Sequence, residues 1–267
     1  MFVNFYPDSG EADFARVVGV TGREYPLQVA RMASEGKLSC VCYDCYTQCS
    51  FINPERGLDM YFRNLNAFYK AAVSAGLPLW TSLLSVGHWH YRVPTEDDLR
   101  WQIATAVARG CEGIVWFYVY GGDGKNSSRG APVDENGYRT PTFGSLARQN
   151  RAFMKYHADN FANSELLKVE HSGHAYGDTP PFVSDELVQS VSSLSGTPLI
   201  ISRFKKFDGG FAVVVVNLSQ VLPTFVKLIP GCGYTTEEPS ESWLAPGQLV
   251  WFDLSERNDT DGSGSLK

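Results

Sequence analysis

The sequence predicts an α/β protein in which a run of β-strand/α-helix units is followed by a small antiparallel β-sandwich. Strand-like apolar runs begin near Phe2, Ser39, Leu79 and Gly113, at the separations expected of βα units. The runs are almost continuously apolar, as a parallel sheet covered on both faces requires. After Ala162 the helical spacing disappears. Four such units make (β/α)4, one half of a TIM-type barrel.

The first two units begin with strands and continue into helices. Residues 2–6 are β-branched and aromatic and stop at a turn cluster, Pro7-Asp8-Ser9-Gly10. A helix is expected over 23–36, where apolar residues recur at helical spacing before a terminal glycine. The second strand is expected over 38–43, and its helix over about 58–75.

The third and fourth units follow at once. Residues 78–84 form a buried strand, and Thr95 is expected to cap the next helix, because its hydroxyl and the acidic first turn suit free N–H groups. The fourth strand is expected over 113–120. A polar loop over 121–141 is long enough for an active-site loop or a disordered crossover, and a helix over about 143–161 completes the set.

The remaining third of the chain is expected to be a β-sandwich domain. Short strands are expected over 199–201, 211–216, 225–229 and 249–252, separated by Gly and Pro turns. The predicted division of the chain is a half barrel over 1–165, a sandwich over 166–255 and a disordered polar tail over 256–267.

Composition excludes several classes of function. The chain is 43% hydrophobic and 13% aromatic, which predicts a folded core. A net charge of −6 without a dense Lys/Arg block gives no footprint for nucleic acid or anionic lipid. No apolar run approaches the roughly 20 residues needed to span a bilayer, and the start lacks a basic region before an apolar stretch. We expect a cytoplasmic protein or one of unknown compartment.

Four of the six cysteines are crowded together, at Cys40, Cys42, Cys45 and Cys49. Their spacing is not the paired C-x2-C pattern of structural zinc sites. The segment instead has the pattern of a strand, in which Cys40 and Cys42 point to one face and pack as small hydrophobes. We therefore expect no metal site and no cofactor, and free thiols favour a reducing compartment.

Several segments resemble barrel glycoside hydrolases of the β-galactosidase-like kind. No single piece is diagnostic, but their order and spacing together are characteristic over about residues 2–161, and the sandwich resembles the C-terminal β-domain of such enzymes. The matching pieces are Tyr43-Asp44-Cys45-Tyr46, Tyr61-Phe62-Arg63-Asn64-Leu65, Pro78-Leu79-Trp80, Pro94-Thr95, Leu99-Arg100-Trp101-Gln102, Ala108-Arg109-Gly110 and Gly113-Ile114-Val115-Trp116-Phe117-Tyr118.

The catalytic pair implied by this resemblance does not transfer to the chain. Retaining enzymes of this kind need two carboxylates about 5–5.5 Å apart. The resemblance places the acid/base after the fourth barrel strand and the nucleophile at the end of the seventh. If Phe2 begins the fifth strand, the fourth is absent, and the seventh ends in Ser82-Leu83-Leu84-Ser85 without an acidic residue.

Residues suited to sugars nevertheless gather where the strands end, the face at which barrel enzymes place their sites. Aromatic faces stack on sugar rings, while carboxylates and imidazoles hydrogen-bond hydroxyls. Asp44 is the first candidate for a catalytic carboxylate and Asp8 the second. The candidate substrate-binding residues are Tyr46, Trp80, His88, Trp89, His90, Trp116, Tyr118 and Tyr120.

Each candidate also has a structural interpretation. Trp116 and Tyr118 alternate with Phe117 and can simply fill barrel layers. Asp44 can cap a loop, and Asp8 belongs to an ordinary turn sequence. The pair His88 and His90 can bind a metal, although two histidines two residues apart, with no third ligand nearby, more often bond locally or to substrate.

The sequence therefore predicts a glycoside hydrolase-like protein that hydrolyses a glycosidic bond in an oligo- or polysaccharide. An open parallel half barrel has two free edges, and two-fold association would close them, so a homodimer is expected. The alternative is a non-catalytic carbohydrate-binding or vestigial half barrel, which the missing carboxylate supports. The sequence also leaves open that the chain is a truncated part of a longer enzyme.

Overall fold

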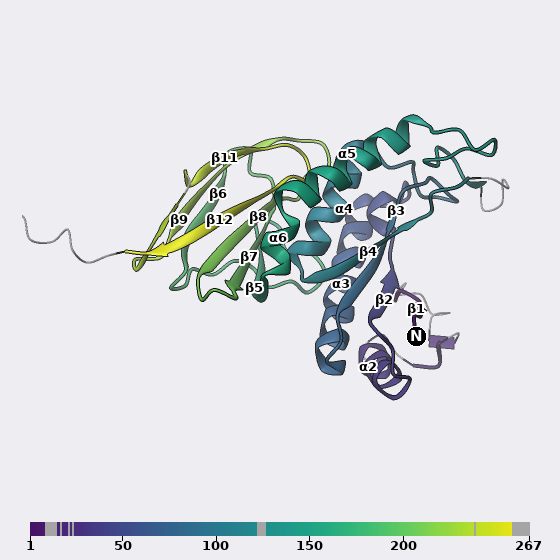
Figure 1. Ribbon diagram of the computed structural model, residues 1–267, viewed down its shortest axis with the longest axis horizontal. Helices are drawn as coiled ribbons and strands as arrows, with labels where there is room; N and C mark the ends of the chain where they lie inside the picture. The colour runs from purple at the N-terminus through teal and green to yellow at the C-terminus, as the bar shows by residue number, and fades with distance from the viewer. Residues whose placement is uncertain are drawn as a thin grey trace, which may run out of the picture.

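The computed structural model describes residues 1–8, 15–16, 18–20, 22, 24–121, 127–237 and 239–257. It has mixed α/β architecture, with one four-stranded parallel sheet and two antiparallel sheets. The parallel sheet and its helices form one end of an elongated molecule, and the antiparallel sheets form the other (Figure 1). The predicted tail lies beyond residue 257 for the most part and so outside the described residues.

The parallel sheet has the strand order β1-β2-β3-β4. Its strands are β1 (Asn4–Phe5), β2 (Val41–Asp44), β3 (Leu79–Leu84) and β4 (Cys111–Phe117). Each strand pairs with its neighbour in the chain, as a right-handed run of βα units does. The predicted strand 113–120 is displaced, because β4 begins at Cys111 and ends at Phe117.

The helices connect these strands as the sequence indicates, with two differences at their ends. Their bounds are α2 (Tyr25–Glu35), α3 (Pro54–Ala75), α4 (Glu96–Ala108), α5 (Pro141–Tyr156) and α6 (Ala158–Ala162). Thr95 caps α4 in a capping box with Asp98, as predicted for this cap. Helix α3 begins four residues before the expected start, because Asn53 caps it and Pro54 occupies the first position. The single helix expected over 143–161 is two helices that meet at His157.

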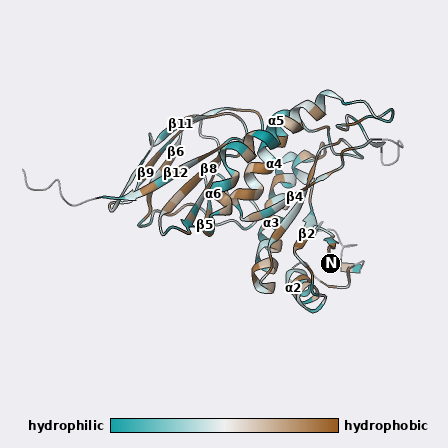
Figure 2. Ribbon diagram, in the orientation of Figure 1, coloured by the Kyte–Doolittle hydropathy of each residue, from teal (hydrophilic) through white to brown (hydrophobic). Residues whose placement is uncertain are grey.

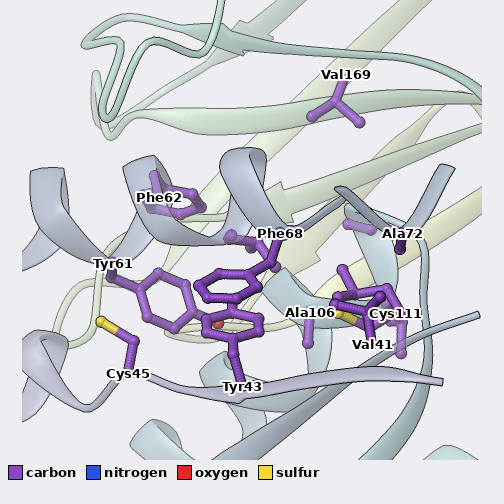
Figure 3. Close-up of a cluster of buried hydrophobic side chains, with 14 of the residues drawn as sticks. Val41, Tyr43, Cys45, Tyr61, Phe62, Phe68, Ala72, Ala106, Cys111 and Val169 are labelled. Carbon is purple, nitrogen blue, oxygen red and sulfur yellow. The ribbon is translucent and has the colours of Figure 1, made fainter. Parts of the chain in front are cut away.

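The described helices α2, α3 and α4 cover one face of the parallel sheet. Val41 and Tyr43 point to that face, and the Tyr43 ring stacks on Phe68 of α3 with centroids 4.2 Å apart (Figure 3). Because strand side chains alternate, Cys42 and Asp44 point to the opposite face. On that face Val115 is 37% exposed and Trp80 is half-buried, so the sheet is apolar on a side that no described helix covers.

The antiparallel region begins directly after α6. A five-stranded sheet has the order β10-β12-β8-β7-β5 and a three-stranded sheet the order β11-β9-β6. The two pack face to face over an apolar cluster to which both contribute, including Ile201, Val213 and Leu228. The strands are β5 (Ser164–Ser172), β6 (Val188–Ser193), β7 (Leu199–Lys206), β8 (Phe211–Asn217), β9 (Thr224–Pro230), β10 (Tyr234–Thr236), β11 (Glu241–Leu244) and β12 (Leu249–Glu256).

The five-stranded sheet packs against the helices of the parallel part, and one cluster of buried residues includes members from both. In Figure 2, hydrophobic (brown) segments occur in both parts. The fully buried Trp101 of α4 donates from Nε1 to the carbonyl of Leu218 at 2.9 Å. Ser202 of β7 donates to the carbonyl of Ala108 at 2.7 Å. The antiparallel region therefore lies on the helix side of the parallel sheet and leaves its other face open.

The cysteines Cys40, Cys42, Cys45 and Cys49 are buried and form no disulfide. Within the described ranges, no three His, Cys, Asp or Glu side chains gather so that they could hold a metal ion. None of the helices in those ranges combines the length and apolarity needed to cross a membrane.

Candidate functional site

Asp44 is the last residue of β2 and lies at the carboxyl end of the parallel sheet. Its neighbour on β1 is Asn4, whose Nδ2 donates to Asp44 Oδ1 at 2.6 Å. The same amide accepts from Cys42 through its Oδ1, with 3.5 Å between the atoms. Parallel register sets Asn4 beside Cys42 and Asp44 beside Ser82. Three adjacent strands thus hold polar groups on one face.

Burial raises the pKa of the Asp44 carboxyl above its ordinary value. Hydrogen bonds from Asn4 and from the Tyr46 hydroxyl to the carboxylate oppose this effect, because they stabilise the charged form. Asp44 is only half-buried, so it is open to a ligand. A carboxyl group whose pKa is raised in a partly apolar place is suited to gain and lose a proton during a reaction.

Aromatic rings close around the carboxyl ends of the strands. Tyr46 follows Asp44 by two residues, and its buried hydroxyl shares a 3.0 Å hydrogen bond with Ser82 Oγ. The Tyr46 ring stacks on Phe117 with centroids 5.3 Å apart and meets the edge of Tyr91 at 5.9 Å. Burial raises the pKa of both tyrosine hydroxyls far above the ordinary value, so both act as neutral hydrogen-bonding groups.

His88 lies in the middle of these rings and is 4% exposed. Its ring centroid is 5.1 Å from those of Tyr91 and Phe117 and 5.9 Å from that of Tyr46. Both ring nitrogens are buried and have no hydrogen-bond partner among the described residues. Burial, together with His90 and Arg129, lowers the pKa of His88, so the imidazole is held neutral. A buried imidazole with two unused polar atoms calls for a polar ligand.

Trp89 follows His88 and has an unusual backbone conformation. Its φ angle is +45°, a left-handed value that costs a bulky residue free energy, and its side chain is 61% exposed. The loop is fixed in this form by Arg129, whose guanidinium donates to the carbonyls of Tyr91 and Trp89 at 2.8 and 3.3 Å. The structure therefore holds an indole ring in solvent beside a buried histidine.

The structure brings most, but not all, of the expected site residues together. Tyr46, His88 and Trp89 lie near one another at the strand ends beside Asp44, while His90 is exposed and packs its ring on Tyr91 at 4.2 Å. Trp80 lies on the uncovered face near the amino end of β3. Its ring covers Gly113, so a side chain at position 113 would collide with the indole. Phe2 contacts the Trp80 ring at 6.4 Å.

Of the remaining expected residues, Tyr118 packs against the buried cluster that contains Tyr46, as Tyr91 and Phe117 do, and the others lie elsewhere. Asp8 lines a hollow of about 800 Å³ beside α2 and α3, and its backbone N–H donates to Asn64 Oδ1 at 2.7 Å. Trp116 points to the helix side, where its Nε1 donates to Asn150 Oδ1 at 3.2 Å. Tyr118 packs against Phe117, and the exposed Tyr120 donates to the carbonyl of Glu135.

Four residues of the cluster were not among the candidates: Asn4, Ser82, Tyr91 and Phe117. Asn4 and Ser82 are polar residues within apolar strands, which is a usable signal because they fall on the same side as Asp44. Phe117 could not be chosen over Trp116, because a strand that is apolar at every position does not reveal which parity points to which face.

This arrangement can bind a sugar through an exposed ring and buried polar groups, and it offers one carboxyl group for proton transfer. Asp44 is the carboxylate whose charge acts on the hydroxyls of Tyr46 and Tyr91. No protein-family model matches the chain, and no curated protein matches it either.

Proposed function

We propose that this protein is a glycoside hydrolase-like protein that hydrolyses a glycosidic bond, with Asp44 as a catalytic carboxylate. The observation that supports the proposal best is the position of Asp44. It is a half-buried carboxyl group with a raised pKa at the carboxyl ends of parallel strands, beside aromatic rings and a neutral imidazole. Glycosidic hydrolysis needs such a group as acid or base.

The surrounding side chains would have separate roles in binding. Trp89 offers a flat exposed ring on which the C–H face of a sugar can stack. Neutral His88 has one donor and one acceptor for hydroxyl groups, and it has no partner for either within the described residues. The Tyr46 hydroxyl, already shared with Ser82, can bridge a sugar hydroxyl to Asp44. The chemistry of the proposed ligand is therefore that of a carbohydrate.

The parallel sheet is proposed to be one half of a TIM-type barrel that a second copy completes. All described helices of the sheet lie on one face, and the other face carries the half-exposed Trp80 and Val115. Parallel sheets are almost always covered on both faces. A homodimer of half barrels would cover this face and pair both free edges.

A second candidate function is carbohydrate binding without hydrolysis. One observation favours it, namely that Asp44 is the carboxylate that acts electrostatically on Tyr46 and Tyr91, whereas glycosidases use a pair of carboxylates. A binding protein of this kind would retain the roles of Trp89 and His88 but would have no use for a proton on Asp44.

A screen for stabilisation and product release separates the two functions. The purified chain is incubated with a panel of oligosaccharides and aryl glycosides, and both its melting temperature and released sugar are measured. The proposal expects one substrate to be hydrolysed and Asp44→Asn to lose at least about 100-fold in rate. The control Asp159→Asn, on the exposed surface of α6, retains full activity. Stabilisation without product supports the binding function instead.

A further inference from the structure

The uncovered face of the parallel sheet is nearly free of charge. The side chains that strand pairing aligns on it from β1 to β4 include polar, apolar and aromatic groups, and Asp44 is the charged member of these pairs; the exposed Glu112 of β4 falls at a register shift outside them. A surface that meets its own copy about a two-fold axis must be self-complementary, so an almost uncharged face is suited to this contact. The set is Asn4, Cys42, Asp44, Trp80, Ser82, Leu84, Gly113, Val115 and Phe117.

The edges of the sheet also fit a second copy. β1 and β4 are the edge strands, and a two-fold axis along the barrel axis sets β4 of each copy beside β1 of the other. Both edges then close at once, and the four strands of each chain give the eight of a closed barrel. The antiparallel region packs on the helix side through Trp101 and Ser202, so it does not obstruct this approach.

We infer that the second carboxylate of the site is Asp44 of the partner subunit. This inference rests on the proposed function. In a barrel with the order β1-β2-β3-β4 repeated twice, the two β2 strands are four positions apart and therefore opposite each other. Both Asp44 side chains end their strands at the same mouth and point to the interior face. The dimer thus brings the two Asp44 carboxyl groups to one mouth of the barrel.

The size of such a barrel indicates the stereochemistry. Strands about 4.8 Å apart and tilted by about 36° enclose a barrel about 15 Å across at the Cα atoms. A carboxyl carbon lies about 2.5 Å from its Cα, so the two Asp44 carboxyls are separated by about 10 Å. Inverting enzymes have their two carboxyl groups about 6.5–9.5 Å apart, and retaining enzymes about 5–5.5 Å apart. The separation in the barrel is therefore closer to that of inverting enzymes.

The reaction balances with one proton on the pair. The protonated Asp44 gives its proton to the glycosidic oxygen as the bond from that oxygen to the anomeric carbon breaks, and the bonding electrons stay on the oxygen. The ionised Asp44 takes a proton from a water molecule whose oxygen bonds the anomeric carbon from the other side. One water is consumed, and the two carboxyl groups have exchanged protonation states.

Mixed dimers test whether both Asp44 side chains serve one site. Wild-type and Asp44→Asn chains are co-expressed with different affinity tags, and dimers that carry both tags are purified. Wild-type chains with the two tags, and wild-type paired with Asp159→Asn, serve as controls. The inference expects the wild-type/Asp44→Asn dimer to lose at least about 100-fold in turnover, like the double variant. Nuclear magnetic resonance of the first product should show an inverted anomer.

The alternative outcomes distinguish this inference from the proposed function. A mixed dimer with half of the wild-type activity, a chain that hydrolyses glycosides as a monomer, or a product with retained configuration overturns the inference and leaves the proposed function standing. A wild-type dimer that hydrolyses no glycoside in the panel overturns both. We expect Asp44→Asn to fold, because asparagine keeps an oxygen that can accept the hydrogen bond from Asn4. Circular dichroism of the variant checks this expectation.

Discussion

The side-chain amide of Asn4 donates a 2.6 Å hydrogen bond to the carboxylate of Asp44, from the adjacent strand and on the same face of the sheet. This contact stabilises the ionised form of a carboxyl group whose pKa burial raises. The first strand of the sheet thus affects the acidity of the group that ends the second.

Replacing Asn4 by Ala should raise the pKa of Asp44 further, because the donor that favours the charged form is lost. The limb of the pH–rate profile that reports ionised Asp44 should move to higher pH. A ¹³C titration of the carboxyl carbon gives the same information without an assay. Val3→Ala, one residue earlier in the chain, is the matched control. An unmoved titration in Asn4→Ala would show that the hydrogen bond has no electrostatic effect.

Lysine at Val115 should prevent dimer formation. Val115 is 37% exposed on the uncovered face of the edge strand β4, so the substitution sets a charge at the proposed contact with the second copy. Sedimentation equilibrium should show a dimer for the wild type and a monomer for Val115→Lys. The control Leu194→Lys changes a 75% exposed residue of the antiparallel region and should stay dimeric. Equal masses for all three proteins would contradict the proposed barrel closure.

Trp101→Phe should destabilise the whole protein by about 1–3 kcal/mol, since it removes a buried ring portion and the bond to the Leu218 carbonyl. Trp101 joins α4 to the five-stranded sheet, so both parts should unfold in one transition that moves to lower denaturant. Urea titration followed by circular dichroism measures this shift. Trp243→Phe, at a 64% exposed indole, should leave the midpoint unchanged. Two separate transitions would mean that the junction does not couple the parts.

His171 should make stability fall in acid. It is buried between Phe62 and Tyr176, its Nδ1 accepts from the Tyr176 N–H, and burial with the charges of Arg109 and His174 lowers its pKa to about 3. Between these two pKa values, His171 binds a proton in the unfolded chain but not in the folded chain. This contribution to stability is present above the ordinary value of 6.5 and is lost as the pH falls from there towards about 3.

His171→Gln should therefore have a flatter dependence of melting temperature on pH between about 6.5 and 4. The comparison concerns the slope, because the substitution also changes packing. A slope equal to that of the wild type would exclude His171 as the cause.

Much of the mixed α/β architecture was predictable from local patterns. Thr95 and its acidic first turn located the start of α4, and Gly76 located the end of α3 with a left-handed φ of +64°. Strand ends were less predictable, because the apolar run that begins at Gly113 continues past Phe117, where β4 ends. The break at His157 has no proline or glycine to mark it, since it lies between Tyr156 and Ala158.

The site was only partly predictable for a similar reason. Asp44, Tyr46 and His88 follow the ends of apolar strands, where a parallel sheet brings loops together. The parity of β4 decided between Trp116 and Phe117, and only the packing of α5 against Trp116 determines it. The left-handed backbone conformation of Trp89 could not be predicted from the sequence either, because it depends on a hydrogen bond from Arg129, which is far away in the chain.

The catalytic role of Asp44 is decided by the release of sugar by the wild-type chain and by Asp44→Asn, measured on a glycoside that raises the melting temperature of both. We expect both proteins to bind the glycoside and Asp44→Asn to release sugar at least about 100-fold more slowly. Equal rates of release would contradict the assignment of Asp44, and no release by either protein would leave carbohydrate binding as the function.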